Sequence, residues 1–298
     1  MARRFVLLTA ARNEALHLPM AIEAVAGQTV RPDLWIIVDD GSTDGTADVI
    51  RAAAAQHPFI SLLSTGSTGP RCFGSKDRAI RAAYDAVLAA PFDFLAVQDA
   101  DIAPGRPDLF AALLAAFERR PTLGIAGGYV HERHGGVWKS RGGNSPDAVA
   151  GGLQMFRRAC YEQIGGYTPL HLGGEDWLAQ LDAARAGWDI QVLTEQPVLH
   201  YRTSSSAGGH LRGLFRLGLM DASFGSHPVF EFLKCARRLG VKPIIAGGAL
   251  RYLGYLWAKL SMQPLSIAPE KAAYLREQQT RKLRCWWKTK FMRARVAL

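Results

Sequence analysis

Up to about residue 130, the chain alternates short apolar segments with longer segments of helical periodicity, and this alternation limits its possible folds more than any other feature. The apolar segments have the length and the β-branched and aromatic content of strands. When a helix connects two such strands, the strands lie parallel, because the helix returns the chain across the sheet. We therefore predict an α/β fold with a doubly wound, mainly parallel sheet flanked by helices. The predicted strands are 5–9, 35–39, 60–64, 94–98 and 124–129, and the predicted helices between them are 14–26, 44–56, 76–89 and 108–119.

Beyond this region the composition changes twice. Residues 135–152 are rich in Gly, Ser and Asn and predict a mobile or substrate-covering loop. Helical patterns return at 157–164 and 175–186, and the chain looks helical after residue 200. Residues 200–298 hold 18 Lys and Arg against four Asp and Glu, whereas residues 1–199 hold 18 against 22. We predict a domain over 1–205 and a basic helical extension over 206–298 whose partner is polyanionic.

The first acidic cluster follows the second predicted strand. Asp39 and Asp40 are followed by Gly41, which permits a tight turn, and by a predicted helix. Two acids at the carboxyl end of a strand are placed to accept hydrogen bonds from a nucleobase or a sugar hydroxyl. Helix capping accounts equally well for Ser42 and Asp44, but it does not account for Asp39 and Asp40 together.

The second cluster follows the fourth predicted strand. Asp99 and Asp101 project to the same face if this segment is extended. Two carboxylates on one face repel each other unless a cation or a donor lies between them. The spacing therefore predicts a site for Mg²⁺ or Mn²⁺, which bind carboxylate and diphosphate oxygens.

Two further features carry chemistry later in the chain. Glu175 and Asp176 follow a glycine pair at the start of a predicted helix, where the helix dipole alone favours acids. They are alternatively placed to supply a general base to an acceptor hydroxyl. His200 follows a short apolar run and is interpreted as a metal ligand, a diphosphate contact or a structural histidine.

These features belong to an ordered set of segments between residues 4 and 203. The segments are Thr9-Ala-Ala-Arg-Asn13-Glu14, Gln28-Thr29, 38–45, Gly74-Ser-Lys76, Asp99-Ala-Asp101, Phe156-Arg157-Arg158, Ile164-Gly165-Gly166-Tyr167 and Gly174-Glu175-Asp176. In this order they resemble the motifs of family 2 inverting glycosyltransferases of the non-processive bacterial type, which have the GT-A fold. The resemblance implies a nucleotide-sugar half over 1–130 and an acceptor half over 131–205.

The resemblance also implies roles for individual residues. The expected donor-binding residues are Thr9, Asn13, Glu14, Asp39, Asp40, Lys76 and Asp99. Among them, Asp40 is expected to bind the nucleobase, Asp39 to support it or bind the ribose, and Lys76 to approach the diphosphate of the nucleotide sugar. Asp99 is expected to contact the ribose or the donor sugar.

The same resemblance implies the catalytic groups. Asp101, together with Asp99 and His200, is expected to hold the divalent cation, Mg²⁺ or Mn²⁺. Asp176 is expected to be the catalytic base, and Glu175 is expected to position the acceptor or the donor. The expected reaction is the inverting transfer of one sugar from a nucleotide-diphosphate sugar to an acceptor hydroxyl, in the assembly of a cell-surface polysaccharide or glycolipid.

The chain departs from the pattern of processive synthases in two ways. It lacks their QxxRW motif, and its sequence shows none of their transmembrane helices, which favours the transfer of a single sugar. The segment Pro70-Arg71-Cys72-Phe73 is an unusual insertion near Lys76, so Arg71 or Arg78 is a candidate to share the phosphate role.

The basic extension predicts where the protein acts. Residues 243–260 are apolar but contain Arg251 and Lys259, which favours a packed helix over a membrane span. Residues 281–295 interleave seven cations with two Trp and one Phe, a composition that suits an anionic lipid surface. The four cysteines are scattered, as in a reduced chain. We expect a cytoplasmic protein peripheral to the inner face of the cell membrane, with a glycan or lipid-linked acceptor and no nucleic acid.

Two other classes of protein account for fewer of these sequence features. A nucleotidyltransferase would need a glycine-rich phosphate loop after the first strand, where this chain has Ala10-Ala-Arg-Asn13. A basic nucleic-acid-binding protein would account for the tail but not for three acidic clusters at the ends of strands and at the start of a helix.

Overall fold

The computed structural model describes residues 4–66, 73–141, 144–202, 210–238 and 245–296. The chain forms two compact units, Met1–Thr203 and Ser204–Leu298. Each unit is described by itself below.

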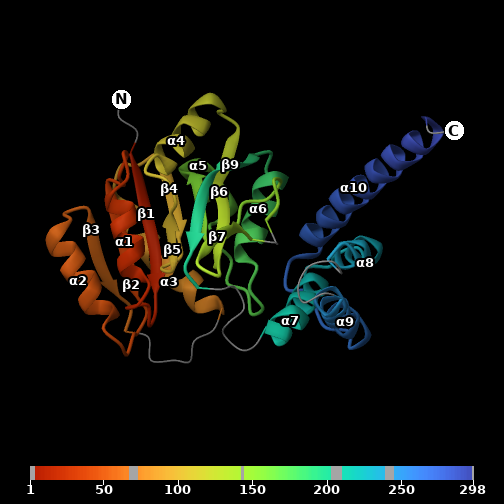
Figure 1. The fold of residues 1–298 in the computed structure, drawn as a ribbon, viewed down its shortest axis with the longest axis horizontal. Helices are drawn as coiled ribbons and strands as arrows, with labels where there is room; N and C mark the ends of the chain where they lie inside the picture. The colour runs from red at the N-terminus through yellow and green to blue at the C-terminus, as the bar shows by residue number, and fades with distance from the viewer. Residues whose placement is uncertain (1–3, 67–72, 142–143, 203–209, 239–244, 297–298) are drawn as a thin grey trace. The chain divides into compact units, whose positions relative to one another are not determined.

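The first unit is built on one large sheet (Figure 1). Its first four strands are β1 (Phe5–Ala11), β2 (Leu34–Asp39), β3 (Ile60–Ser64) and β4 (Phe94–Gln98). They lie parallel in the order β3-β2-β1-β4, so the carboxyl ends of all four meet at one edge of the sheet. These four predicted strands are confirmed.

Helices cover both faces of this parallel half. They are α1 (Leu18–Ala26), α2 (Thr46–Gln56), α3 (Phe73–Val87) and α4 (Leu109–Arg119). Because side chains alternate along a strand, Phe5 and Leu7 of β1 pack with α1, α2 and α4, whereas Val6 and Leu8 pack with α3 on the other face. The doubly wound arrangement is therefore confirmed. Helix α1 begins four residues later than predicted, because the chain turns at Asn13, whose φ is 57°.

Beyond β4 the sheet is mixed. Its remaining strands are β5 (Ile102–Pro104), β6 (Leu123–His134), β7 (Val137–Ser140), β8 (Leu153–Arg157) and β9 (Asp189–His200). Two further helices of this unit are α5 (Arg158–Ile164) and α6 (Glu175–Arg185). Strand β8 is antiparallel to both β4 and β6, and β6 is parallel to β9. Two reversals restore the direction of β4, so β6 and β9 also end at the edge where β1 to β4 end. The predicted sheet is parallel from β3 to β4 and again between β6 and β9, and its antiparallel strands are β5, β7 and β8.

The predicted loop at 135–152 is partly wrong. Gly135 and Gly136 have positive φ angles and turn β6 back into β7, which pairs with it as a hairpin. Between residues 144 and 152 the described chain has turns and one isolated bridge, as expected from its composition.

Two adjacent arginines donate hydrogen bonds to the carboxyl-terminal ends of helices on opposite faces of the sheet. Arg157 donates hydrogen bonds to the carbonyls of Phe117 and Arg120 at the end of α4. Arg158 donates to the carbonyls of Leu88 and Ala90 at the end of α3. Since the last carbonyls of a helix have no partner within the helix, these guanidinium groups complete both helices.

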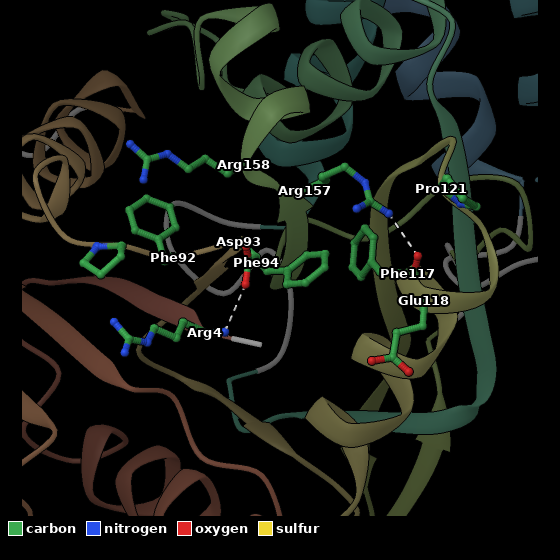
Figure 2. Close-up of a pocket in the computed structure, with 10 residues that line it drawn as sticks. Arg4, Phe92, Asp93, Phe94, Phe117, Glu118, Pro121, Arg157 and Arg158 are labelled. Carbon is green, nitrogen blue, oxygen red and sulfur yellow. Dashed lines mark hydrogen bonds between the residues drawn. The ribbon is translucent and has the colours of Figure 1, made fainter. Parts of the chain in front are cut away.

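Figure 2 shows the two arginines in a cavity of about 1050 Å³ at the amino-terminal ends of β1 and β4. The guanidinium carbon of Arg158 lies 4.2 Å from the ring centroid of Phe92, and that of Arg157 lies 5.4 Å from the centroid of Phe94. The cavity is at the edge of the sheet opposite to the acidic clusters, and its arginines are engaged with backbone and aromatic rings.

We expect Arg157→Lys to lower the free energy of unfolding by about 1–3 kcal/mol. Nε of Arg157 donates to the Leu123 carbonyl, and one terminal nitrogen donates to the Phe117 and Arg120 carbonyls. A lysine has a single terminal nitrogen and no planar fork, so it cannot serve all three acceptors. Urea unfolding followed by circular dichroism measures the change. Arg81→Lys, on the exposed side of α3, is the control and should leave the urea midpoint unchanged. If Arg157→Lys also left the midpoint unchanged, Arg157 would not stabilise the end of α4.

The second unit is helical, with α7 (His210–Ser223), α8 (Pro228–Ala236), α9 (Ala246–Leu260) and α10 (Pro269–Val296). Helices α7 and α9 pack through Gly218 and Gly254, each of which faces the backbone of the other helix. A charged network joins Asp221 of α7 to Arg251 of α9 and to Lys234 of α8. None of the helices that the structure describes is both long and apolar enough to cross a membrane.

Each unit has a buried cysteine. Cys160 of α5 is fully buried in the first unit, and Cys235 of α8 is 3% exposed in the second. Burial raises the pKa of each thiol to about 12. Cys285 of α10 is exposed, and Cys72 lies outside the described residues.

Candidate active site

The acidic clusters meet at the edge where the strands end. The predicted residues come from the ends of β1, β2 and β9, from the segments that follow β1, β2 and β4, and from the amino-terminal turns of α3 and α6. This placement follows from the topology, because all four strands run in the same direction.

The residues predicted to bind the nucleoside lie at the end of β2. Asp40 accepts a hydrogen bond from the Thr65 hydroxyl at 2.9 Å, and its second oxygen lies 4.0 Å from a guanidinium nitrogen of Arg12. Asp39 accepts a hydrogen bond from the backbone N–H of Ser42, which fixes the turn into α2. Both acids are 8% exposed, and Asp40 is held at the end of the strand by its neighbours.

The predicted residues of the β1 segment lie in three different surroundings. Asn13 accepts a hydrogen bond from the backbone N–H of Thr43 and so joins the turn after β1 to the turn after β2. Glu14 is 4% exposed and pairs with Arg202. Thr9 is fully buried, and its hydroxyl accepts a hydrogen bond from the indole N–H of Trp35. The structure therefore places Thr9 in the core and does not bring it to the site.

Lys76 connects the second and third acidic clusters. Its ammonium nitrogen lies 2.6 Å from Asp99 and 3.6 Å from Glu175. Burial alone would lower the pKa of Lys76, but Asp99 and Glu175 raise it above its ordinary value. Burial raises the pKa of Asp99, and Lys76 opposes this effect. Lys76 is thus a permanent cation at the centre of the acidic edge.

Asp101 faces a different set of groups. Nε2 of His200 and Nε of Arg202 each lie 3.5 Å from Asp101 Oδ2, and the other ring nitrogen of His200 lies 3.5 Å from Glu132. Burial would raise the pKa of Asp101, but His200 and Arg202 lower it. Burial would lower the pKa of His200, yet hydrogen bonds to Asp101 and Glu132 raise it to about 9. Asp99 and Asp101 therefore have separate positively charged partners.

Asp176 lies at the first turn of α6. Its backbone carbonyl accepts hydrogen bonds from the side chains of Gln154 and Gln180, and Tyr167 donates to Gln154. Gly151 lies against its carboxylate, because a Cβ at that position would come within 2.5 Å of Oδ2. Burial and the neighbouring carboxylate of Glu175 raise the pKa of Asp176 to about 6, against the effect of Lys76. A carboxylate with this pKa can accept a proton near neutral pH.

The donor atoms of Asp101 and His200 fit a divalent cation. A carboxylate oxygen and an imidazole nitrogen are ligands of Mn²⁺ and Mg²⁺, which often take their remaining ligands from phosphate and water. No group of three His, Cys, Asp or Glu side chains within the described part of the chain is arranged to hold a metal.

Sequence reasoning missed several residues of the site. Arg202 stands two residues after His200, and its ion pairs with Glu14 and Asp101 depend on contacts between distant segments. Glu132 belongs to a part of β6 beyond the predicted strand, and its contact with His200 depends on the β6–β9 register. Arg71 and Arg78, by contrast, were predicted from the sequence to share the phosphate role. Arg78 donates a hydrogen bond to the hydroxyl of Ser75, one turn earlier on α3, at 3.4 Å. Arg71 lies outside the described residues.

Comparisons with known proteins agree with this arrangement. The family model described as "Glycosyltransferase like family 2" matches residues 3–216. The N-acetylglucosaminyl-diphospho-decaprenol L-rhamnosyltransferase of Mycobacterium tuberculosis, in strains CDC 1551 / Oshkosh and ATCC 25618 / H37Rv, is 24% identical over an alignment of 230 residues. The match covers 64% of this chain and 73% of that protein.

Two solved structures share the fold. The mannosyltransferase PcManGT from Pyrobaculum calidifontis, in complex with GDP-Man and Mn²⁺, gives a TM-score of 0.57 at 20% identity and covers 96% of this chain and 84% of its own. Residues 1–349 of S. aureus TarS, in complex with UDP-GlcNAc, give a TM-score of 0.55 at 13% identity and cover 91% and 78%. At these identities the likeness shows the fold alone.

Proposed function

The chain belongs to glycosyltransferase family 2 and has the GT-A fold, and on this premise we propose that it transfers one sugar, with inversion, from a nucleoside-diphosphate sugar to an acceptor hydroxyl. The observation that carries the proposal is the position of Lys76 between Asp99 and Glu175. In this proposal Lys76 binds the donor diphosphate, and its neighbour Glu175 positions the acceptor or the donor. Membership of this family argues against the nucleotidyltransferase and nucleic-acid-binding alternatives.

The donor occupies the ends of β1, β2 and β4 in this proposal. Asp40 binds the nucleobase, with Asp39 supporting it or the ribose, and Asn13 holds the turn on which both depend. Lys76 binds the diphosphate by exchanging its contact with Asp99 for phosphate oxygens. Glu14 contributes by orienting Arg202. Thr9 is withdrawn from the donor site, since its hydroxyl is engaged in the core.

Asp101 and His200 would hold Mg²⁺ or Mn²⁺, with Asp99 beside them. When bound, the cation neutralises the charge that develops on the leaving diphosphate. The presence of GDP-Man and Mn²⁺ in the PcManGT complex supports this assignment for a protein of the same fold.

The acceptor hydroxyl approaches Asp176 in this proposal. The carboxylate accepts the hydroxyl proton while the oxygen attacks the anomeric carbon from the face opposite to the diphosphate, which gives inversion in one displacement. Glu175 remains paired with Lys76 and so keeps the diphosphate-binding cation beside the reacting groups. Gln154 and Gln180 hold the backbone of Asp176 in place during the proton transfer.

This mechanism predicts a pH dependence. Because a base must be deprotonated to act, kcat/KM should be half-maximal near pH 6 and fall about tenfold per pH unit below it. An ordinary aspartate would place this limb near pH 4. Initial rates measured between pH 5 and 8 with the donor and Mn²⁺ in excess test the position of the limb. A profile that stays flat down to pH 5 would contradict the assignment of Asp176 as the base.

The acceptor that we propose is a lipid-linked glycan in cell-wall glycan assembly. The relative from M. tuberculosis is named for a diphospho-decaprenol acceptor, which supports a substrate held at a membrane. The second unit supports the same location, because it carries exposed Leu253 and Trp257 on α9 and Trp286 and Trp287 on α10. Its basic composition complements anionic lipid. We place the protein on the inner face of the cell membrane, bound peripherally through α10.

Deletion of residues 281–298 should abolish co-sedimentation with vesicles that contain anionic phospholipid. The deletion removes seven cations and both tryptophans of α10, whereas the contacts of α10 with residues 225–227 are made before residue 281. Vesicles of zwitterionic lipid are the control and should bind neither form. Equal sedimentation of the two forms with anionic vesicles would exclude α10 as the attachment.

Ligand-dependent thermal stabilisation tests the proposed function. We expect one of UDP-, GDP- or dTDP-sugars to raise Tm in the presence of Mn²⁺, and by much less without it, because ligands that bind only the native state stabilise it. Magnesium chloride at the same ionic strength is the control that distinguishes a specific effect of Mn²⁺ on Tm from a general effect of salt. If no nucleotide sugar changes Tm with either cation, the proposal is overturned.

A further inference from the structure

Strand β6 carries a buried acid, Glu132, to which the sequence assigns no role. Only 6% of it is exposed, and its Cα is paired in register with that of His200 on β9. On the other side of β9, Ile102 of β5 is the register partner of His200, so Asp101 lies beside the ring as well. His200 therefore stands between two carboxylates, one on β6 and one in the turn immediately before β5.

The two ring nitrogens of His200 face different acids. Nδ1 lies 3.5 Å from Glu132 Oε1, and Nε2 lies 3.5 Å from Asp101 Oδ2. An imidazole offers a cation one nitrogen at a time, and the acceptor of the other N–H fixes both the plane of the ring and the nitrogen that is offered. Here Glu132 is placed to accept the Nδ1–H, which leaves Nε2 on the side of Asp101.

We infer that Glu132 is a positioning residue that holds the imidazole of His200 so that Nε2 is presented to a divalent cation shared with Asp101. This inference rests on the proposed function, in which Asp101 and His200 are the metal ligands. In this inference Glu132 acts through His200, since the imidazole ring lies between its carboxylate and Asp101. A carboxylate behind the ring also makes Nε2 a stronger donor to a metal.

Mn²⁺ binding to the full chain tests the inference without an activity measurement. Free Mn²⁺ is followed by electron paramagnetic resonance at one fixed pH, with Mn²⁺ as the only added ligand. Glu132→Ala should weaken Mn²⁺ binding by about 10–100-fold, the usual effect of removing a group that orients a metal-binding histidine. Glu132→Gln keeps an oxygen that accepts the Nδ1–H and should lose less than Glu132→Ala. Glu195→Ala, at an exposed position of β9, is the control and should not change binding.

A double-mutant cycle on Mn²⁺ binding tests whether Glu132 acts by positioning His200 or by a general effect of its buried negative charge. If Glu132 acts through His200, then Glu132→Ala combined with His200→Ala should bind Mn²⁺ no more weakly than His200→Ala alone. Additive losses would overturn the inference, because Glu132 would then act without His200. Should Glu132→Ala fail to unfold cooperatively, the nearly isosteric Glu132→Gln takes its place in the cycle.

The remaining outcomes distinguish this inference from the proposed function. Weakened binding in His200→Ala with unchanged binding in Glu132→Ala would overturn the inference and leave the proposed function intact. Unchanged binding in His200→Ala would overturn both the metal role of His200 and the inference. A wild-type chain that binds no Mn²⁺, alone or with a nucleoside diphosphate, would count against the proposed function itself.

Discussion

Replacing Asp176 with Asn is expected to lower kcat by about 10²–10⁴-fold while the donor still binds, because an amide cannot accept the acceptor proton. The position of α6 should survive the change, since Gln154 and Gln180 hold the backbone carbonyl of residue 176 and not its carboxylate. Transfer to an acceptor is measured by mass spectrometry of the product. Donor binding is measured separately as the shift in Tm with Mn²⁺ and the nucleotide sugar.

Asp182→Asn supplies the control on the same helix, one to two turns further along α6. It removes a carboxylate of the same size and should leave kcat within about twofold of the wild type, as for most substitutions away from the reacting groups. Retained transfer in Asp176→Asn would exclude this residue as the base. Loss of both transfer and donor binding would instead mean that the variant disturbs the site as a whole.

The second large effect is expected in the helical unit. Gly254→Ala should destabilise this unit by about 3 kcal/mol, because an added Cβ would lie 2.1 Å from the carbonyl oxygen of Phe215. Helix propensity alone predicts the opposite sign, a gain of about 1 kcal/mol for Gly→Ala in a helix. The contact between α7 and α9 therefore decides the outcome. Gly218→Ala should behave alike, since its Cβ would lie 1.9 Å from the Arg251 carbonyl.

Limited proteolysis and urea unfolding monitored by circular dichroism measure this effect. Gly45→Ala is the matched control, because its Cβ would have nothing within 4 Å and its φ is −75°. If Gly254→Ala were as stable as the wild type, then α7 and α9 would not pack at this distance in solution.

The parallel half of the sheet was predictable from sequence because its strands are short, apolar and separated by amphipathic helices. Strand β9 was missed for physical reasons. Its sequence alternates irregularly, Pro197 interrupts it, and its register with β6 shifts between Gly128 and Tyr129. Strands β5 and β7 have three and four residues and carry little periodic signal. The reversal of direction at β8 depends on its pairing with β4 and β6, which local sequence patterns do not encode.

The acidic residues of the site were predictable because they follow strands whose ends must meet. Thr9 shows where this reasoning went too far. It shares the face of β1 with Phe5 and Leu7, so the period of two already directs its side chain beneath α1 and against Trp35. Arg202 and Glu132 illustrate the opposite limit. Their contacts join segments that are far apart in the sequence, and only the register of β6, β9 and β5 brings them together.

The buried cysteines give the two units independent reporters of their opening. A thiol enclosed in a folded unit reacts with an alkylating agent only when that unit opens, so its labelling rate measures the population of the open form. Cys160 reports on the sheet and Cys235 on the helices, while the exposed Cys285 reacts at once and calibrates the reagent. A donor nucleotide that binds the sheet should then slow the labelling of Cys160 specifically. The labelling rates of Cys160 and Cys235 thus show which of the two units a given ligand stabilises.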